Sequence, residues 1–106
     1  MQKLRFEFST EDPADGTNRM VLIGVVASGN LEVLVERTLQ SRTCFVEIAT
    51  TTIGFDEVWY AVVSDFVHRC GTGGLRFSIN DCGARPDVVS LRLSQGLRLI
   101  AGHQPT

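Results

Sequence analysis

The chain has 106 residues, of which 43% are hydrophobic and 21% are charged, and its formal net charge is −2. This length favours one domain, and the composition is that of an ordinary globular protein. The negative charge argues against a general nucleic-acid binder, which needs a clustered basic surface, and no apolar run is long enough to cross a bilayer. We therefore expect neither a nucleic acid nor a membrane among its partners.

Three cysteines, Cys44, Cys70 and Cys82, are spread along the chain without any C-x-x-C pair. An odd number of cysteines at these spacings predicts neither a disulfide framework nor a zinc site. Free thiols are typical of a reducing compartment, so we expect a cytoplasmic protein.

The first part of the chain combines strand patterns with turn residues. Residues 4–8 alternate strictly between apolar and charged side chains, which predicts a half-buried strand, and residues 9–18 are rich in turn formers. The nearly continuous apolar run over residues 20–27 predicts a central strand that is covered on both faces. Gly24 within this run indicates a bulge or a close packing neighbour.

Residues 31–36 form the next predicted strand, and the short gap before them predicts a β-hairpin. Gly29 and Asn30 suit the central pair of a primed turn because both tolerate positive φ, whereas Ser28 and Gly29 are a poorer pair. The glutamates of the strand then point to one face of the sheet. Four apolar side chains are predicted to share the other face: Val26, Leu31, Val33 and Val35.

The clearest element lies between Phe55 and Cys70, after a further predicted sheet strand at residues 44–50. Its apolar residues recur at i, i+3 and i+4 and form one continuous stripe, which predicts a long amphipathic helix. Acidic residues at its start and a basic residue at its end match the helix dipole, and the glycine-rich residues 71–74 end it.

Two further strands are predicted after the helix. Residues 75–80 alternate between apolar and polar side chains, residues 81–87 form a loop, and residues 88–93 predict the last strand. The pattern therefore predicts one α+β domain over residues 1–106. It contains a mostly antiparallel sheet of about five to six strands, with the one long helix from Phe55 to Cys70 packed on one face.

Ser28 lacks the neighbours of a catalytic serine. An activated serine needs a base and an oxyanion hole, and the nucleophile elbow needs a glycine two residues earlier on a strand-to-helix turn. Here Val26 occupies that position and a strand follows. Of the two histidines, His68 falls on the polar face of the helix and His103 in the tail. The residues alone predict a turn serine and no catalytic residue.

Metal and phosphate sites find equally little support. His68, Cys70, Asp81 and Cys82 include ligand types, but no spacing brings them together. Core packing explains Cys70, which belongs to the helix stripe, and Cys44, which belongs to a strand, better than metal binding does. The glycines of residues 71–74 end a helix instead of beginning one, so they do not form a phosphate-binding loop. We therefore predict no metal site.

Two stretches resemble the acyl carrier (delta) subunit of malonate decarboxylase. Residues 26–34 are VASGNLEVL, which is similar to a V-x-S-G-(D/N)-L-E-V-L hairpin of that family. Residues 81–95 are DCGARPDVVSLRLSQ, which is similar to the family pattern D-x-G-A-x-P-x-V-V-x-L-R-L-x-Q. The departures are mild: Asn30 stands where aspartate is frequent, and Cys82 lies within the second stretch.

The resemblance implies that Ser28 is modified instead of reacting itself. In the family the serine carries 2'-(5''-phosphoribosyl)-3'-dephospho-coenzyme A through a phosphodiester, and Gly29 would belong to the turn that presents it. A prosthetic-group transferase installs the group. A malonyl (acyl) transferase subunit exchanges acetyl for malonyl on its thiol, and decarboxylase subunits release CO2. The chain itself would be a non-catalytic carrier subunit.

Two other functions stay open. The carrier (gamma) subunit of citrate lyase uses the same type of group on a serine, although the Gly-Ala-x-Pro segment favours malonate decarboxylase. A small non-catalytic interaction domain would share only the α+β pattern. Glu32 and Glu36 are candidate contacts for a basic coenzyme-binding partner, against the simpler expectation of solvated surface acids.

Overall fold

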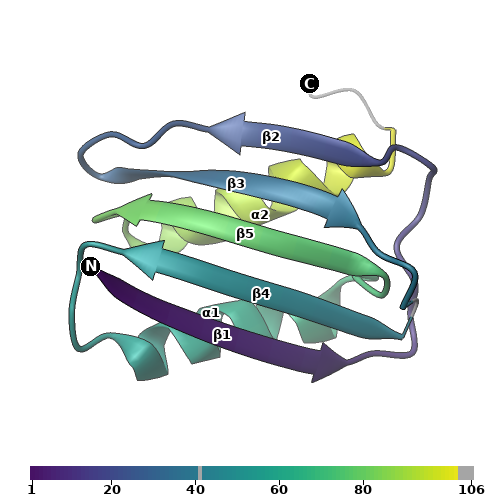
Figure 1. Ribbon diagram of the computed structural model, residues 1–106, viewed down its shortest axis with the longest axis horizontal. Coiled ribbons are helices and arrows are strands. Elements are labelled where there is room, and N and C mark those ends of the chain that lie inside the picture. The colour runs from purple at the N-terminus through teal and green to yellow at the C-terminus, as the bar shows by residue number, and fades with distance from the viewer. Residues whose placement is uncertain (41, 103–106) are drawn as a thin grey trace.

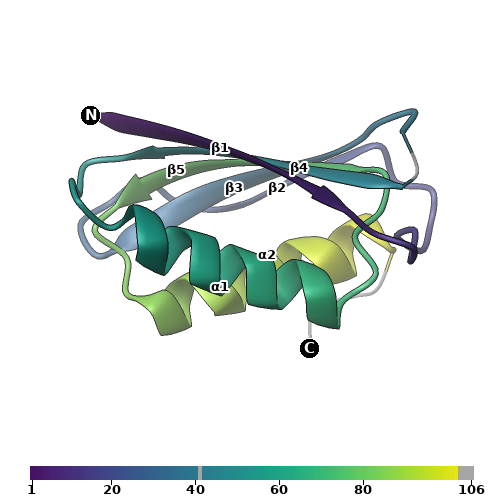
Figure 2. The ribbon, with the colours of Figure 1, turned by 90° about the horizontal axis from the view of Figure 1, so that it is seen from below.

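The computed structural model describes residues 1–40 and 42–102, which form a five-stranded sheet and two helices (Figure 1). The elements follow one another as β1 (Gln2–Ser9), β2 (Met20–Gly24), β3 (Asn30–Arg37), β4 (Thr43–Thr50), α1 (Asp56–Arg69), β5 (Leu75–Cys82) and α2 (Pro86–Ile100). The sheet order is β1-β4-β5-β3-β2. Both helices cover the same face of the sheet, as the edge-on view in Figure 2 shows. The predicted α+β class is confirmed.

The sheet is mixed. Strands β1 and β4, β2 and β3, and β3 and β5 pair antiparallel, whereas β4 and β5 pair parallel. A parallel pair needs a crossover connection, and α1 supplies it between β4 and β5. The expected mostly antiparallel sheet is therefore confirmed, with one parallel pair at its centre.

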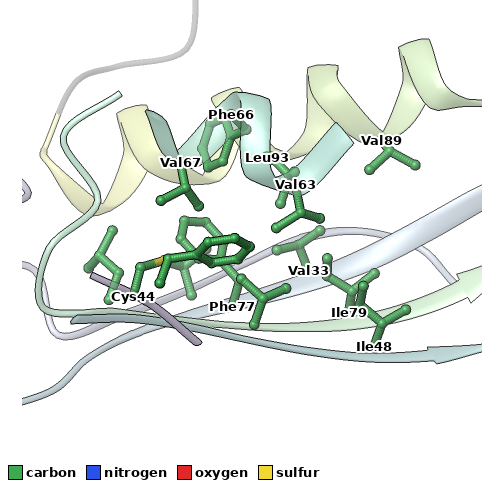
Figure 3. Packing of buried hydrophobic residues seen from close by; sticks show 14 of the residues in the cluster. Val33, Cys44, Ile48, Val63, Phe66, Val67, Phe77, Ile79, Val89 and Leu93 are labelled. Atoms are coloured by element: carbon green, nitrogen blue, oxygen red, sulfur yellow. The ribbon is translucent and has the colours of Figure 1, made fainter. Parts of the chain in front are cut away.

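The core lies between the sheet and the two helices. Strands β3, β4 and β5 alternate between buried and partly exposed side chains, because successive residues of a strand point to opposite faces. Figure 3 shows their inward side chains meeting residues of both helices. Phe66 of α1 and Phe77 of β5 stack edge to face, with ring centroids 5.6 Å apart. Each fully buried apolar side chain contributes about 1.5–3 kcal/mol to the hydrophobic driving force.

Helix α1 confirms the amphipathic helix predicted between Phe55 and Cys70. Four of its residues are buried: Trp59, Val63, Phe66 and Val67. The stripe does not stay buried at the start of the helix, where Phe55 is 48% and Val58 42% exposed. Within the described part of the chain, neither helix is long and apolar enough to span a membrane.

Residues 88–93, predicted as a strand, belong to helix α2 instead. Two helices therefore cover the sheet, where one was predicted. Pro86 occupies the first turn of α2 and Asp87 follows it, both favourable at a helix start. The buried residues of α2 recur at helical spacing: Val89, Leu93, Gly96 and Ile100. Residues 88–93 are too short a window to distinguish this period from the alternation of a strand.

Strand β2 contradicts the central strand predicted at residues 20–27. It ends at Gly24 and lies at the edge of the sheet, where Met20 and Leu22 point to the uncovered face and are exposed. Val26 lies beyond the strand, is exposed, and does not share the buried face of β3 as predicted. The predicted close neighbour of Gly24 is confirmed: at φ 84° an added Cβ would collide with the carbonyl oxygen of Leu31.

All three cysteines are free, and Cys44 is fully buried in β4. Burial raises the pKa of the Cys44 thiol from 9.0 to about 11, because the thiolate is poorly solvated there. The folded state therefore holds the thiol proton more tightly than the unfolded state does. The resulting stabilisation is complete below pH 9.0 and is lost as the pH rises through about 11.

We expect the free energy of unfolding to fall between these pH values by up to about 1.4 kcal/mol per pH unit from Cys44 alone. Denaturant titrations across this range would measure the slope. Cys44→Val, which fills the site without a titrating group, should remove this part of it. Equal slopes for the two proteins would contradict the prediction.

Candidate functional site

The β2–β3 connection ends in a tight turn with Ser28 and Gly29 at its centre. Asn30 N donates to the carbonyl oxygen of Ala27 at 2.9 Å, and Gly29 has φ 74°. The predicted central pair, Gly29 and Asn30, is therefore wrong by one residue. Among the described residues only glycines have positive φ, so Ser28 does not bear the strain that made it a poor choice for a primed turn.

Ser28 is exposed on this turn, and the backbone beside it is held firmly. Gly29 N donates to the carbonyl oxygen of Cys82 at 2.8 Å, which ties the turn to the end of β5. An added Cβ at Gly29 would meet nothing within 4 Å. The Ser28 hydroxyl is thus carried on an anchored backbone with open space around it.

A buried carboxylate fixes the loop that anchors this turn. Asp81 accepts hydrogen bonds from Thr50 Oγ1 at 2.8 Å, Ala84 N at 2.9 Å and Gly83 N at 3.2 Å. It is 3% exposed. These bonds hold the chain where β5 ends. Asp81 therefore also positions the neighbouring Cys82 carbonyl oxygen, which accepts the hydrogen bond from Gly29 N.

An arginine of α2 lies beneath the β2–β3 connection. Arg92 Nε donates to Asn30 Oδ1 at 3.4 Å, and Arg92 Nη1 donates to Gln95 Oε1 at 2.9 Å. The same Asn30 oxygen accepts from the backbone N–H of Leu31 at 2.8 Å. Arg92 and Gln95 belong to the second resemblance stretch, but the sequence assigns them no role.

An apolar groove of about 370 Å³ opens at the same end of the sheet. Figures 1 and 2 show the β2–β3 connection, the end of β5 and the starts of both helices together there. Phe55, Val58 and Trp59 line one side of the groove, and Ala84, Pro86 and Val89 line another. The one titratable lining residue, Asp81, already uses its carboxylate in hydrogen bonds. The groove therefore offers apolar contact and no acid–base group.

Comparison with known proteins decides the family. The family model described as "Malonate decarboxylase delta subunit" matches residues 18–100. The chain belongs to the malonate decarboxylase delta subunit family. The malonate decarboxylase acyl carrier protein of Bradyrhizobium diazoefficiens is 56% identical over 95% of this chain and 96% of its own. That of Acinetobacter calcoaceticus is 44% identical over 96% and 99%.

A solved structure agrees with this membership. One chain of a Pseudomonas malonate decarboxylase hetero-tetramer in complex with malonate is 35% identical to this chain, and its TM-score is 0.83. The alignment covers 94% of this chain and 99% of that one. The resemblance to malonate decarboxylase is confirmed, and these matches give the citrate lyase alternative no support.

The two stretches that carried the malonate decarboxylase resemblance meet in space. Asn30 pairs with Cys82 across β3 and β5, Gly29 donates to Cys82, and Arg92 donates to Asn30. The contact between Arg92 and Asn30 joins residues 62 positions apart. The family resemblance identified both stretches, but the sequence gave no signal that they lie together. Their proximity depends on the pairing of β3 with β5 and on the helical fold of α2.

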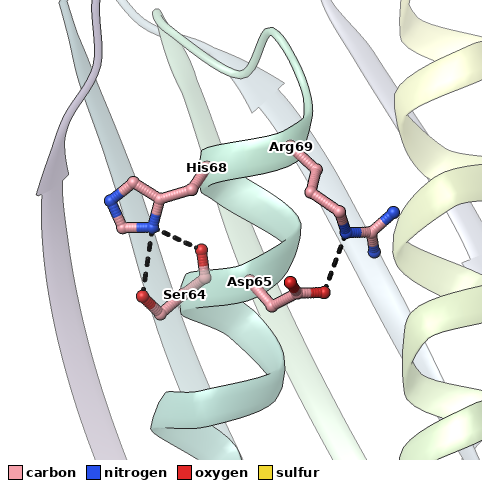
Figure 4. Close-up of polar contacts among 4 residues, drawn as sticks. All are labelled: Ser64, Asp65, His68 and Arg69. Carbon is pink, nitrogen blue, oxygen red and sulfur yellow. Dashed lines mark hydrogen bonds and ion pairs between the residues drawn. The ribbon is translucent and has the colours of Figure 1, made fainter.

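Ser64 and His68 contact each other one turn apart on α1 (Figure 4). His68 Nδ1 lies 2.7 Å from the Ser64 carbonyl oxygen and 3.2 Å from Ser64 Oγ. A carbonyl can only accept, so a hydrogen bond from Nδ1 to it requires the proton on Nδ1, and in that tautomer Nδ1 does not act as a base toward Ser64. His68 is exposed near the end of α1, away from the Ser28 turn, and His103 lies outside the described residues.

The remaining candidates from the sequence are the possible metal ligands and the two glutamates of β3. In the described part of the chain, no three His, Cys, Asp or Glu side chains cluster so that they could hold a metal ion. Cys70 packs against the core. Glu32 and Glu36 lie on the uncovered face of the sheet as predicted, and Glu32 accepts from Asn80 Nδ2 at 3.2 Å. Their contact with a basic partner stays a prediction.

Proposed function

We propose that this chain serves malonate decarboxylase as its acyl carrier subunit, in which Ser28 is the covalent attachment point of 2'-(5''-phosphoribosyl)-3'-dephospho-coenzyme A. The observation that carries the proposal is the meeting of both family stretches around an exposed serine on an anchored turn. Gly29 allows the turn, and the Cys82 carbonyl holds it in place.

The residues around Ser28 fit a bulky phosphodiester. The side chains of the turn are small, and the space around Gly29 is open. The group would supply a thiol on which acetyl and malonyl are carried as thioesters. This chain would supply the hydroxyl, a fixed backbone and a cation near it, whereas the base that activates the hydroxyl would come from the attaching enzyme.

A carrier of this kind needs no catalytic residue of its own. A tethered acyl group meets a docked partner at high effective concentration, so the chain has to hold the attachment point and bind its partners. We propose that these partners are the acyl-transferase and decarboxylase subunits and, during maturation, a prosthetic-group transferase. The solved hetero-tetramer containing a similar chain supports such an assembly. We place this assembly in the cytoplasm.

Intact mass spectrometry tests the proposal. The chain is coexpressed with the attachment enzymes, and the purified protein and its peptides are weighed. We expect the added mass of the group on the peptide that contains Ser28. Ser28→Ala should abolish the addition, whereas Ser9→Ala, which removes an exposed serine at the far end of β1, should retain it. Addition to the alanine variant, or a bare chain in every preparation, would overturn the proposal.

A further inference from the structure

We infer that Arg92 binds the phosphate that joins Ser28 to its prosthetic group, and that it acts as the resident counter-charge of the attachment site. The inference rests on the proposed function, because it takes the phosphodiester on Ser28 as given. Arg92 would be a positioning residue. It would hold the phosphate at which the prosthetic group joins the chain, and it would not touch the reacting acyl group.

The side chain of Arg92 reaches both ends of the β2–β3 connection. Its Cδ lies 3.5 Å from the position of a Cβ built on Gly24, the last residue of β2. Its Nε donates to Asn30, the first residue of β3. The guanidinium is therefore placed under the segment that carries Ser28, and Gln95 holds it from the helix side.

The guanidinium also keeps donor capacity. Nε and Nη1 make the bonds to Asn30 and Gln95, and within the described residues Nη2 makes none. Guanidinium groups recognise phosphate through such remaining N–H donors, because charge-assisted bonds to a planar fork are strong. Asn30 follows Ser28 by two residues, so their Cα atoms are at most about 7.6 Å apart. A phosphate on Ser28 Oγ would therefore be attached two residues from the side chain that Arg92 contacts.

The charge of Arg92 has no carboxylate partner among the described residues. Three other arginines are paired with acids, in the contacts Arg69–Asp65, Arg76–Glu47 and Arg85–Asp87. Arg37 donates to backbone carbonyls, including that of Ile100 at 3.0 Å. Arg92 is partly buried between α2 and the connection, where an unpaired cation loses hydration. An anion on Ser28 would complete this site.

The test measures the coupling between Arg92 and the attached group. Chemical unfolding is compared for modified and unmodified protein, in the wild type and in Arg92→Gln, Arg92→Lys and Arg98→Gln. We expect modification to lower the unfolding equilibrium constant of the wild type by about three- to fivefold. The effect should vanish in Arg92→Gln, shrink in Arg92→Lys, and persist in Arg98→Gln, which removes an exposed arginine of the same helix.

A spectroscopic measurement separates electrostatic contact from a purely structural role. The 31P resonance of the phosphodiester should shift between the modified wild type and Arg92→Gln, and should not shift in Arg98→Gln. If Arg92→Gln does not fold, Arg92→Lys decides, since a changed donor geometry must still move the resonance. An unchanged resonance and an unchanged coupling, with the mass present on Ser28, would overturn this inference alone. Absence of the mass would instead overturn the proposed function.

Discussion

Replacing Ser28 with alanine is expected to abolish malonate turnover by a complex assembled with this carrier. Without the hydroxyl, the proposed prosthetic group would have no oxygen through which to join the chain, so no acyl thioester would be presented. The expected loss is complete, because a covalent tether has no partial substitute. Release of CO2 from malonate by the coexpressed complex would measure it.

The same substitution should leave the fold intact. Ser28 is exposed, and its hydroxyl makes no hydrogen bond within the described residues, so the change in unfolding free energy should stay within about 0.5 kcal/mol. Ser9→Ala is the matched control, with an exposed serine lost and full turnover expected. Turnover by the Ser28→Ala complex would contradict the role of Ser28, whereas a complex that fails to assemble would show that Ser28 itself is needed for assembly.

Replacing Asp81 with alanine is expected to lower the free energy of unfolding by about 3 kcal/mol, more than Ser28→Ala or Asp65→Ala does. Three donors would lose their partner: Thr50 Oγ1, which is buried, and Gly83 N and Ala84 N, whose hydrogen bonds are part-buried. A buried donor left unpaired, as Thr50 Oγ1 would be, costs about 1–3 kcal/mol, and the two part-buried N–H groups add smaller amounts because water can reach them. Denaturant titration of the unmodified protein measures the change.

Two variants make this test specific. Asp81→Asn keeps one acceptor oxygen and should lose less than Asp81→Ala. Asp65→Ala removes an exposed acid that pairs with Arg69 on the surface of α1, and it should change stability by less than about 1 kcal/mol. Equal effects of Asp81→Ala and Asp65→Ala would show that the buried hydrogen bonds of Asp81 do not stabilise the loop.

Local patterns predicted the elements whose period is unambiguous. The stripe from Phe55 to Cys70 spans several turns, so its helical period could not be mistaken. Residues 88–93 are too few for this distinction, and the decisive residues, Gly96 and Ile100, lie beyond them. Gly96 is buried against β3, where an added Cβ would lie 2.8 Å from Val35 Cγ2. A glycine that serves a close helix–sheet contact gives no hydrophobic signal in the sequence.

The site shows the same division between local and long-range information. The resemblance predicted Ser28, and the turn chemistry placed the turn within one residue. The anchoring of that turn by Cys82 and its approach by Arg92 could not be predicted, since both depend on how β3, β5 and α2 assemble. The edge position of β2 was equally hidden, because an apolar run does not specify which strands lie beside it.

The contacts of Gly29 and Asn30 with residues from the last quarter of the chain would set a time order on the proposed loading of Ser28. Cys82 and Arg92 are synthesised after most of the sheet, and they reach the Ser28 turn when β5 and α2 take their places. A nascent or truncated chain presents the serine without these neighbours. An attaching enzyme that recognises the assembled surface would therefore modify only carriers that have finished folding. Misfolded or truncated chains would stay without the coenzyme.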